Sequence, residues 1–127
     1  MATIINTDNA PAAIGPYVQG VDLGNLIFLS GQIPIDPVSG KIPEGIESQT
    51  AQVLDNISAV LNSAGLSPSN IIKTTIFLVD LADFNGVNQI YEQFFKEANA
   101  IFPARSCVQV SGLPRNVKIE IEVIASR

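Results

Sequence analysis

The spacing of apolar residues divides this chain into two predicted helices and six predicted strands. Apolar residues recur every three or four positions in residues 46–64 and again in residues 84–98, which is the helical pattern. Short runs with strand character lie at residues 4–5, 17–23, 26–29, 71–79, 105–110 and 117–125. Because two helices cover only one face of such a sheet, the other face is either solvated or covered by another subunit.

Turn-forming residues separate these elements. Gly24-Asn25 is typical of a hairpin turn, and Gly65 is typical of the residue that follows the last turn of a helix. Asp80 or Asp83 is suited to cap the second helix, because a short carboxylate accepts hydrogen bonds from free backbone N–H groups. The predicted elements therefore follow the order β-β-β-α-β-α-β-β.

The length of 127 residues predicts a single domain that spans residues 1–127. The chain contains one cysteine, Cys107, which cannot form an internal disulfide, and this favours a reducing, cytoplasmic location. It contains no histidine, which excludes a serine–histidine–aspartate triad and the usual histidine-ligated zinc sites.

The charge balance argues against nucleic acid as a partner. The chain has 7 basic and 12 acidic residues, a net charge of −5, and no basic cluster that would follow a phosphate backbone. No apolar run reaches the roughly 18 residues of a membrane-spanning helix, and no positive charge precedes Lys41, so we expect neither a membrane segment nor a targeting peptide. The hydrophobic fraction of 46% indicates either an aliphatic core or apolar surface buried between subunits.

The last two predicted strands carry the most informative side chains. If they form an antiparallel hairpin, the register that pairs apolar residues with apolar residues gives one apolar face. The other face then places Cys107 opposite Glu120 and Arg105 opposite Glu122, with paired Cβ atoms roughly 5 Å apart. The sequence thus predicts a guanidinium, a thiol and carboxyl groups on one face of the sheet.

Two interpretations of this face remain open. Surface ion pairs of this kind are common and contribute little to stability. Alternatively, the face binds a small carboxylate, because the planar fork of Arg105 forms two parallel hydrogen bonds with such a group. Glu120 would then position a water or transfer a proton, and Cys107 would be a nucleophile, a proton relay or a packing residue.

Four stretches in a fixed order give a specific resemblance. They are APAAIGPYVQGV, LSGQIPIDPVSG, FNGVNQIYEQFF and PARSCVQVSGLPRNVKIEIE. Together they resemble the reactive intermediate deaminase family, known as RidA or YjgF, and the resemblance extends over nearly the whole chain.

The resemblance implies a chorismate-mutase-like α+β fold: a six-stranded mixed sheet with two helices on one face. It also implies a homotrimer whose sheets line a central barrel-like core, with three sites in clefts between subunits. The implied activity is hydrolysis of enamines and imines, such as 2-aminoacrylate, 2-iminopropanoate and 2-iminobutanoate, to 2-oxo acids and ammonia. Pyridoxal-phosphate-dependent dehydratases release these intermediates, and the hydrolysis itself is expected to need no metal or cofactor.

The resemblance also implies roles for residues of the last two strands. Arg105 matches the arginine that binds the substrate carboxylate. Glu120 matches the glutamate that orients the attacking water or assists proton transfer, and Cys107 lies in the pocket with an accessory role. The alternative is a trimer that binds 2-oxo acids through Arg105 without turnover. A carboxylate beside a carboxylate-binding site repels the ligand, which is expected only if that carboxylate takes part in catalysis. The presence of Glu120 therefore favours the enzyme over the binding protein.

Four further residues match pocket positions of the family. Tyr17 would reach the cleft from across the subunit interface, Ser30 and Gly31 would form a wall whose backbone binds substrate or water, and Asn88 would lie near the cleft. Each has a simpler reading. Tyr17 is then an interface aromatic, Ser30 caps a turn, Gly31 supplies a positive φ at a strand end, and Asn88 is an exposed helix residue.

Overall fold

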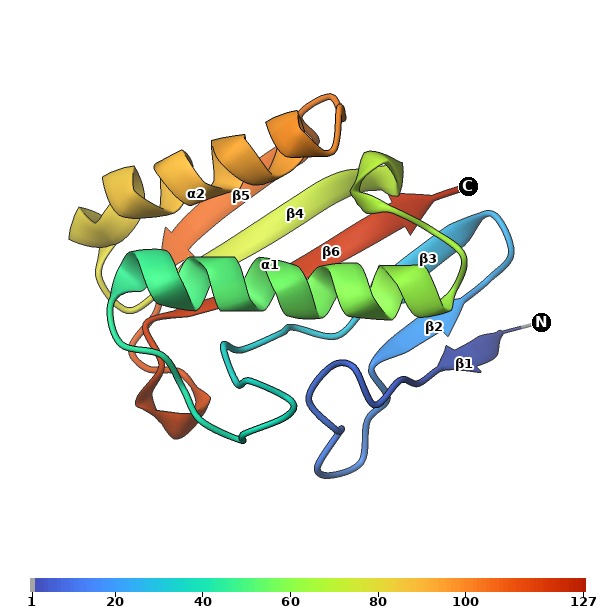
Figure 1. Ribbon diagram of the computed structural model, residues 1–127, viewed down its shortest axis with the longest axis horizontal. Coiled ribbons are helices and arrows are strands. Elements are labelled where there is room, and N and C mark those ends of the chain that lie inside the picture. The colour runs from blue at the N-terminus through green and yellow to red at the C-terminus, as the bar shows by residue number, and fades with distance from the viewer. Residues whose placement is uncertain (1) are drawn as a thin grey trace.

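The computed structural model describes residues 2–127 and has the predicted order of elements (Figure 1). Short 3-10 turns follow α1, β4 and β5, at Pro68–Asn70, Leu81–Asp83 and Pro114–Asn116. The strands and helices are β1 (Thr3–Ile5), β2 (Gly20–Asp22), β3 (Leu26–Leu29), α1 (Ile46–Ser63), β4 (Ile71–Leu78), α2 (Phe84–Glu97), β5 (Ala104–Gln109) and β6 (Ile119–Ser126).

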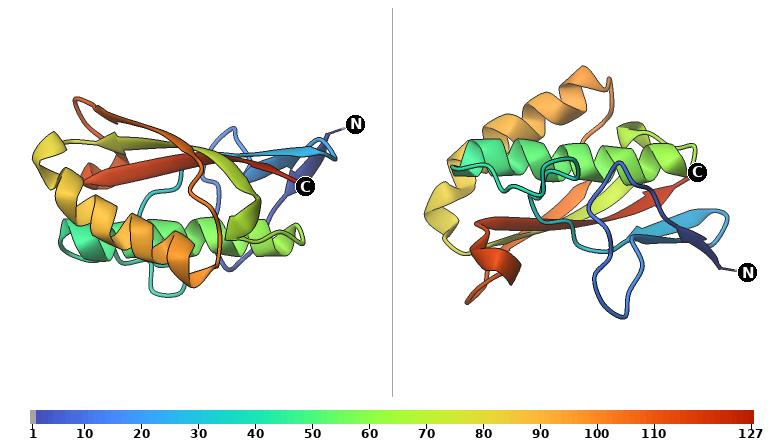
Figure 2. Two further views of the ribbon diagram at one scale, coloured as in Figure 1. Left: turned by 90° about the horizontal axis from the view of Figure 1, so that it is seen from above. Right: turned by 60° about the horizontal axis from the view of Figure 1, so that its bottom comes forward.

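The strands form one mixed sheet in the order β1-β2-β3-β6-β4-β5. Neighbouring strands are antiparallel except for β4 and β5, which run parallel because α2 returns the chain between them. Both helices lie on the same side of the sheet, as the left view of Figure 2 shows. The predicted α+β fold, with a six-stranded mixed sheet and two helices on one face, is confirmed.

The predicted hairpin of the last two strands is wrong. Strand β4 lies between β5 and β6, so Cys107 is level with Ile76 of β4, while Glu120 is level with Phe77. Side chains alternate along β4, and these two positions therefore point to opposite faces. Arg105 and Cys107 lie on the face that the helices cover, whereas Glu120 and Glu122 lie on the open face.

The long-range pairing of β6 with β4 explains this difference. Ile119 and Ile121 are level with Leu78 and Ile76 of β4, and all four side chains are fully buried beneath the helices. Strand β5 forms the sheet edge instead, and five of its six residues are exposed. An edge strand tolerates polar side chains on both faces, so the alternation within β5 did not specify its partner.

The core lies between the sheet and the helical layer. The predicted stripe of α1 is buried from Ile46 to Leu61, and α2 buries Val87, Tyr91 and Phe95. Gly65, with φ of 76°, ends the α1 region as predicted, because this backbone conformation favours glycine. The predicted cap of the second helix is wrong: Asp83 lies at the N-cap of α2 but its side chain accepts no capping hydrogen bond, and the carboxylate of Asp80 accepts the Ala82 N–H at 2.9 Å in the 3-10 turn before the helix.

Buried amides hold the long loops against this core. The side chain of Gln19 accepts the Thr7 N–H at 2.7 Å and donates to the Pro11 carbonyl at 2.8 Å. The amide of Asn56 on α1 donates to the carbonyls of Ile33 and Ile35. These bonds fix the loop that precedes β2 and the loop that follows Gly31. Among residues 2–127, no helix is both long and apolar enough to cross a bilayer.

Candidate functional site

Arg105 lies on the edge strand β5 and extends toward α2. One of its Nη atoms donates to the side-chain oxygen of Asn88 at 2.7 Å. The guanidinium carbon lies 5.2 Å from the ring centroid of Phe84 and 5.0 Å from that of Tyr91. The predicted approach to Glu120 or Glu122 does not occur, because those carboxylates lie on the other face of the sheet.

The charge of Arg105 is available to an anion. Over residues 2–127, the ion pairs within 4.0 Å join Lys96 to Glu92 and Arg127 to Asp22, and none involves Arg105. The guanidinium borders two surface hollows of about 400 and 420 Å³. Besides Arg105, the first is lined by Asn88, Tyr91, Glu92, Phe102 and Pro103, and the second by Leu81, Phe84 and Cys107.

Cys107 lies beside Arg105 in the second hollow and is half-buried. Burial raises the pKa of its thiol, and the charge of Arg105 opposes this shift only in part. The thiolate is the nucleophilic form of cysteine, so a raised pKa keeps Cys107 in its less reactive form. This environment suits packing or hydrogen bonding better than covalent catalysis.

Glu120 lies on the open face and packs against Gly31. A Cβ atom added to Gly31 would lie 2.9 Å from Cδ of Glu120 and 3.1 Å from its Cγ, and closer still to Oε2. The φ of Gly31 lies outside the left-handed region, so the reading in which Gly31 supplies a positive φ is wrong. Gly31 is instead required for space, because the carboxyl group of Glu120 occupies the place of a side chain.

The environment of Glu120 favours its protonated form. Burial raises the pKa of this carboxyl group above its ordinary value, and the nearby charge of Glu122 raises it further. Raised carboxyl pKa values are typical of groups that exchange protons during catalysis, although structural carboxyls show them too. The raised pKa makes Glu120 a candidate for acid–base chemistry.

Backbone hydrogen bonds hold the Ser30–Gly31 pair beside Glu120. The hydroxyl of Ser30 donates to the Val18 carbonyl at 2.6 Å, which leaves its oxygen free only as an acceptor. Gln32 exchanges two backbone hydrogen bonds with Ile121, at 2.8 and 3.1 Å. The strand that carries Glu120 and the segment that carries Gly31 are therefore joined directly.

Tyr17 stands apart from both groups. Its side chain is 52% exposed, and its hydroxyl accepts the Ile14 N–H at 3.4 Å. It lines none of the hollows that contain Arg105 or Glu122. Within one chain, the predicted residues thus form one group around Arg105, a second around Glu120, and the separate Tyr17.

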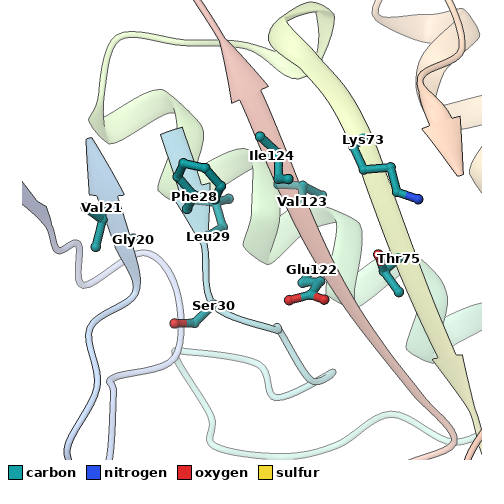
Figure 3. A pocket seen from close by; sticks show the side chains of 10 residues that line it. All are labelled: Gly20, Val21, Phe28, Leu29, Ser30, Lys73, Thr75, Glu122, Val123 and Ile124. Atoms are coloured by element: carbon teal, nitrogen blue, oxygen red, sulfur yellow. The ribbon is translucent and has the colours of Figure 1, made fainter. Parts of the chain in front are cut away.

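The open face carries its own hollow of about 400 Å³ across β2, β3, β6 and β4 (Figure 3). Figure 3 shows Glu122 of β6 between Phe28 of β3 and Lys73 of β4. The ammonium group of Lys73 donates to the Ser106 hydroxyl at 2.9 Å. This mixture of apolar and charged groups is exposed in a single chain.

Sequence reasoning missed Phe84 and Tyr91 as neighbours of Arg105. It assigned both to the apolar stripe of the second helix, where they do belong. Their spacing from Asn88 by four and three residues was the available signal, since such residues share a helix face. Within residues 2–127 there is no cluster of three or more histidine, cysteine, aspartate or glutamate side chains suited to a metal ion.

Comparison with known proteins gives relatives that match nearly the full chain. A family model described as endoribonuclease L-PSP matches residues 7–127. The chain is 59% identical over 127 residues to the 2-iminobutanoate/2-iminopropanoate deaminase of Escherichia coli K12, covering 100% of this chain and 99% of the relative.

Two solved structures superimpose closely. The Escherichia coli YjgF gene product matches with a TM-score of 0.97 and 58% identity, covering 98% of each chain. Escherichia coli TdcF, crystallised with bound serine, also matches with a TM-score of 0.97, at 54% identity and with 98% of each chain covered.

Proposed function

The chain belongs to the RidA/YjgF family, to which the endoribonuclease L-PSP model corresponds, and from this premise we propose that it is a reactive intermediate deaminase. Its substrates are 2-imino acids such as 2-iminobutanoate and 2-iminopropanoate, together with the related enamine 2-aminoacrylate. Water converts them to 2-oxo acids and ammonia. The observation that carries the proposal is the 59% identity, over the whole chain, to a deaminase with these imine substrates.

Arg105 binds the substrate carboxylate. Its guanidinium has no acidic partner within residues 2–127, and it borders hollows large enough for a small acid. An arginine forms two parallel, charge-assisted hydrogen bonds with a carboxylate, which fixes both the position and the orientation of the substrate. The other predicted pocket residues act around this anchor.

The complete site forms between subunits of a homotrimer. Arg105 and Glu120 lie on opposite faces of the sheet, on strands separated by β4, so their Cα atoms are at least roughly 10 Å apart within one chain. A neighbouring subunit that covers the open face also meets this chain at its exposed edge strand β5, and there it brings its Glu120 and Gly31 toward Arg105, with Tyr17 reaching the same cleft. Exposed apolar side chains on that face, including Phe28 and Val108, favour such burial.

Hydrolysis then needs only water and groups of the protein. An enamine first takes a proton at carbon and becomes the imine. Glu120 and backbone groups near Gly31 orient a water that adds to the imine carbon, and Glu120 accepts the proton that this water loses. The carbinolamine nitrogen then takes the proton from Glu120. Its C–N bond breaks as the hydroxyl group loses its proton to water and becomes the carbonyl, which releases ammonia and leaves the 2-oxo acid. Cys107 borders this space as a neutral thiol in an accessory role.

A coupled assay tests the proposal. Threonine dehydratase generates the imine, and release of the 2-oxo acid is followed with and without the protein. The buffer is reducing, as in the cytoplasm, because the chain has a single cysteine. We expect release to accelerate in proportion to protein concentration. Release at the uncatalysed rate at every protein concentration would overturn the deaminase function.

A binding protein without turnover is the second candidate. TdcF, 54% identical to this chain, was crystallised with serine, which carries a carboxylate but no imine. On this alternative Arg105 retains its role while Glu120 does not contribute to a reaction. Binding of 2-oxobutanoate measured by calorimetry, combined with no acceleration in the coupled assay, would favour it.

The pH profile of the reaction should follow Glu120. Because burial and Glu122 raise the pKa of this carboxyl group, kcat/KM should rise with pH through a midpoint above the ordinary glutamate value of 4.5. We expect Glu122→Gln to move the midpoint toward lower pH and Glu120→Gln to remove it, after subtraction of the uncatalysed rate. If the midpoint of the pH profile does not move in Glu122→Gln, the charge of Glu122 does not raise the pKa of Glu120.

The same pKa shift predicts a change in stability. The folded state holds the Glu120 proton more tightly than the unfolded state, so this group stabilises the fold at low pH. Its contribution is lost as pH rises from 4.5 through the raised pKa. Glu120→Gln should flatten the pH dependence of the midpoint of urea unfolding in this window.

Mixing two inactive variants tests the shared site. In trimers of Arg105→Ala and Glu120→Ala subunits, a cleft is intact where an unaltered Arg105 meets an unaltered Glu120 of the neighbour. Random 1:1 assembly places one such cleft in each mixed trimer, so activity should return to about a quarter of the wild-type value. The activity is measured after joint refolding, with separately refolded and then mixed variants as control. No recovery would indicate a site built within one subunit.

A further inference from the structure

Three side chains of α2 surround the guanidinium of Arg105 on one side. Phe84, Asn88 and Tyr91 follow one another at intervals of four and three residues, which places them on one face of the helix. The two aromatic rings lie 5.2 and 5.0 Å from the guanidinium carbon, and the amide oxygen of Asn88 accepts a hydrogen bond between them. We call these three residues the α2 cradle.

The α2 cradle is anchored to the core at Tyr91. This side chain is 4% exposed, and its ring packs against Phe95 with centroids 4.8 Å apart. Its hydroxyl forms a hydrogen bond of 2.8 Å with Thr74 on β4, the strand paired with β5. The contact of the ring with Phe95 and the hydrogen bond of the hydroxyl with Thr74 fix the orientation of Tyr91. They thereby also fix the ring face that lies against the guanidinium of Arg105.

The chemistry of the α2 cradle orients Arg105 without neutralising it. Aromatic faces attract a cation through their quadrupole, and an amide oxygen accepts a hydrogen bond, but neither carries a formal charge. A carboxylate in the same place would hold Arg105 equally well and would compete with the substrate carboxylate. Asn88 takes a single N–H group, which leaves the others for a two-bond contact with an anion.

We propose that Phe84, Asn88 and Tyr91 are positioning residues that hold Arg105 in the geometry that binds the substrate carboxylate. Asn88 acts on Arg105 rather than on the substrate. The inference rests on the proposed function, in which Arg105 is the carboxylate anchor. To that function it adds two points. The α2 cradle holds the guanidinium in place, and it brings no negative charge that would compete with the substrate carboxylate.

Binding of 2-oxobutanoate, the stable product, tests the α2 cradle in the intact oligomer. Phe84→Leu removes one ring and keeps an apolar side chain, and we expect its Kd to rise about three- to tenfold. Asn88→Asp places a carboxylate on Arg105, and we expect a rise of about tenfold or more. In the coupled assay both changes should appear in KM more than in kcat, since carboxylate binding is common to substrate and transition state. Phe94→Leu is the matched control, because Phe94 is on α2 but does not contact Arg105.

The Nε–H resonance of Arg105 provides a second measurement. Ring currents from two aromatic faces shift this proton upfield, and Phe84→Leu should move it downfield while Phe94→Leu leaves it in place. If Arg105→Ala binds 2-oxobutanoate as wild type does, the anchor role in the proposed function is wrong. If Arg105→Ala loses binding while Phe84→Leu and Asn88→Asp retain wild-type Kd values and the wild-type resonance, the anchor stands and the α2 cradle is overturned.

Discussion

Arg105→Ala is expected to lower kcat/KM for the imine by roughly 30- to 1,000-fold while the protein still folds. Loss of one partner from a hydrogen-bonded charge pair costs about 2–4 kcal/mol, and each 1.36 kcal/mol corresponds to about tenfold in rate. The fold should tolerate the change because Arg105 is exposed on the edge strand and forms no ion pair with residues 2–127. The coupled assay measures the rate, and circular dichroism and light scattering check the fold and the assembly.

Two further variants sharpen this result. Arg115→Ala removes another exposed arginine that makes no ion pair with the described residues, and we expect wild-type activity from it. Arg105→Lys keeps the charge but not the planar fork, and it should recover only part of the activity. Equal losses in Arg105→Ala and Arg115→Ala would indicate a general effect of net charge and would contradict the anchor role.

Gly31→Ala should lower activity about 10- to 100-fold, nearly as much as Glu120→Ala, through a steric effect on Glu120. The added methyl group would lie 2.9 Å from Cδ of Glu120, closer than real Cβ contacts, so the carboxyl group must rotate away. Because the clash involves the end of a flexible side chain, the cost in folding stability should be about 1 kcal/mol. A displaced carboxyl group no longer orients the attacking water.

The effect of Gly31→Ala should depend on the residue at position 120. In a Glu120→Ala background the clash disappears, so Gly31→Ala should cause no further loss, and the double-mutant cycle should show strong coupling. Gly112→Ala is the matched control, because a Cβ atom there meets nothing within 4 Å and its φ is not positive. Additive losses at positions 31 and 120 would show that Gly31 acts by some other means than the placement of Glu120.

Local patterns predicted the elements well because local physics determines them. Apolar residues at helical spacing in α1 bury one stripe of the helix, and Gly65 follows its end with the expected positive φ. Alternation in the last strand predicted one apolar face, and Ile119, Ile121 and Val123 are buried on it. These features depend on contacts between residues close in sequence, or on a single buried face.

The sequence singled out residues for the candidate site but did not give their arrangement. Arg105 and Cys107 border a hollow, and Glu120 packs against Gly31, yet the hairpin that was to join them was wrong. The roles of these three residues stay predictions. The polar edge strand β5 satisfies its alternation equally well beside β6 or beside β4. The choice between these partners depends on the burial of Ile76 and Leu78, which lie 31 positions before Cys107 and Gln109, the residues of β5 that pair with them.

By itself the sequence determined the order of elements, the two helices on one face and the residue types available for chemistry, because periodicity and composition are properties of short segments. Only the tertiary structure decided that β4 separates Arg105 from Glu120, that Gly31 provides space for a carboxyl group, and that the α2 cradle receives a guanidinium. These outcomes come from strand order and side-chain packing. The free energy of the whole molecule determines the strand order and the packing, so no single segment of the sequence encodes them.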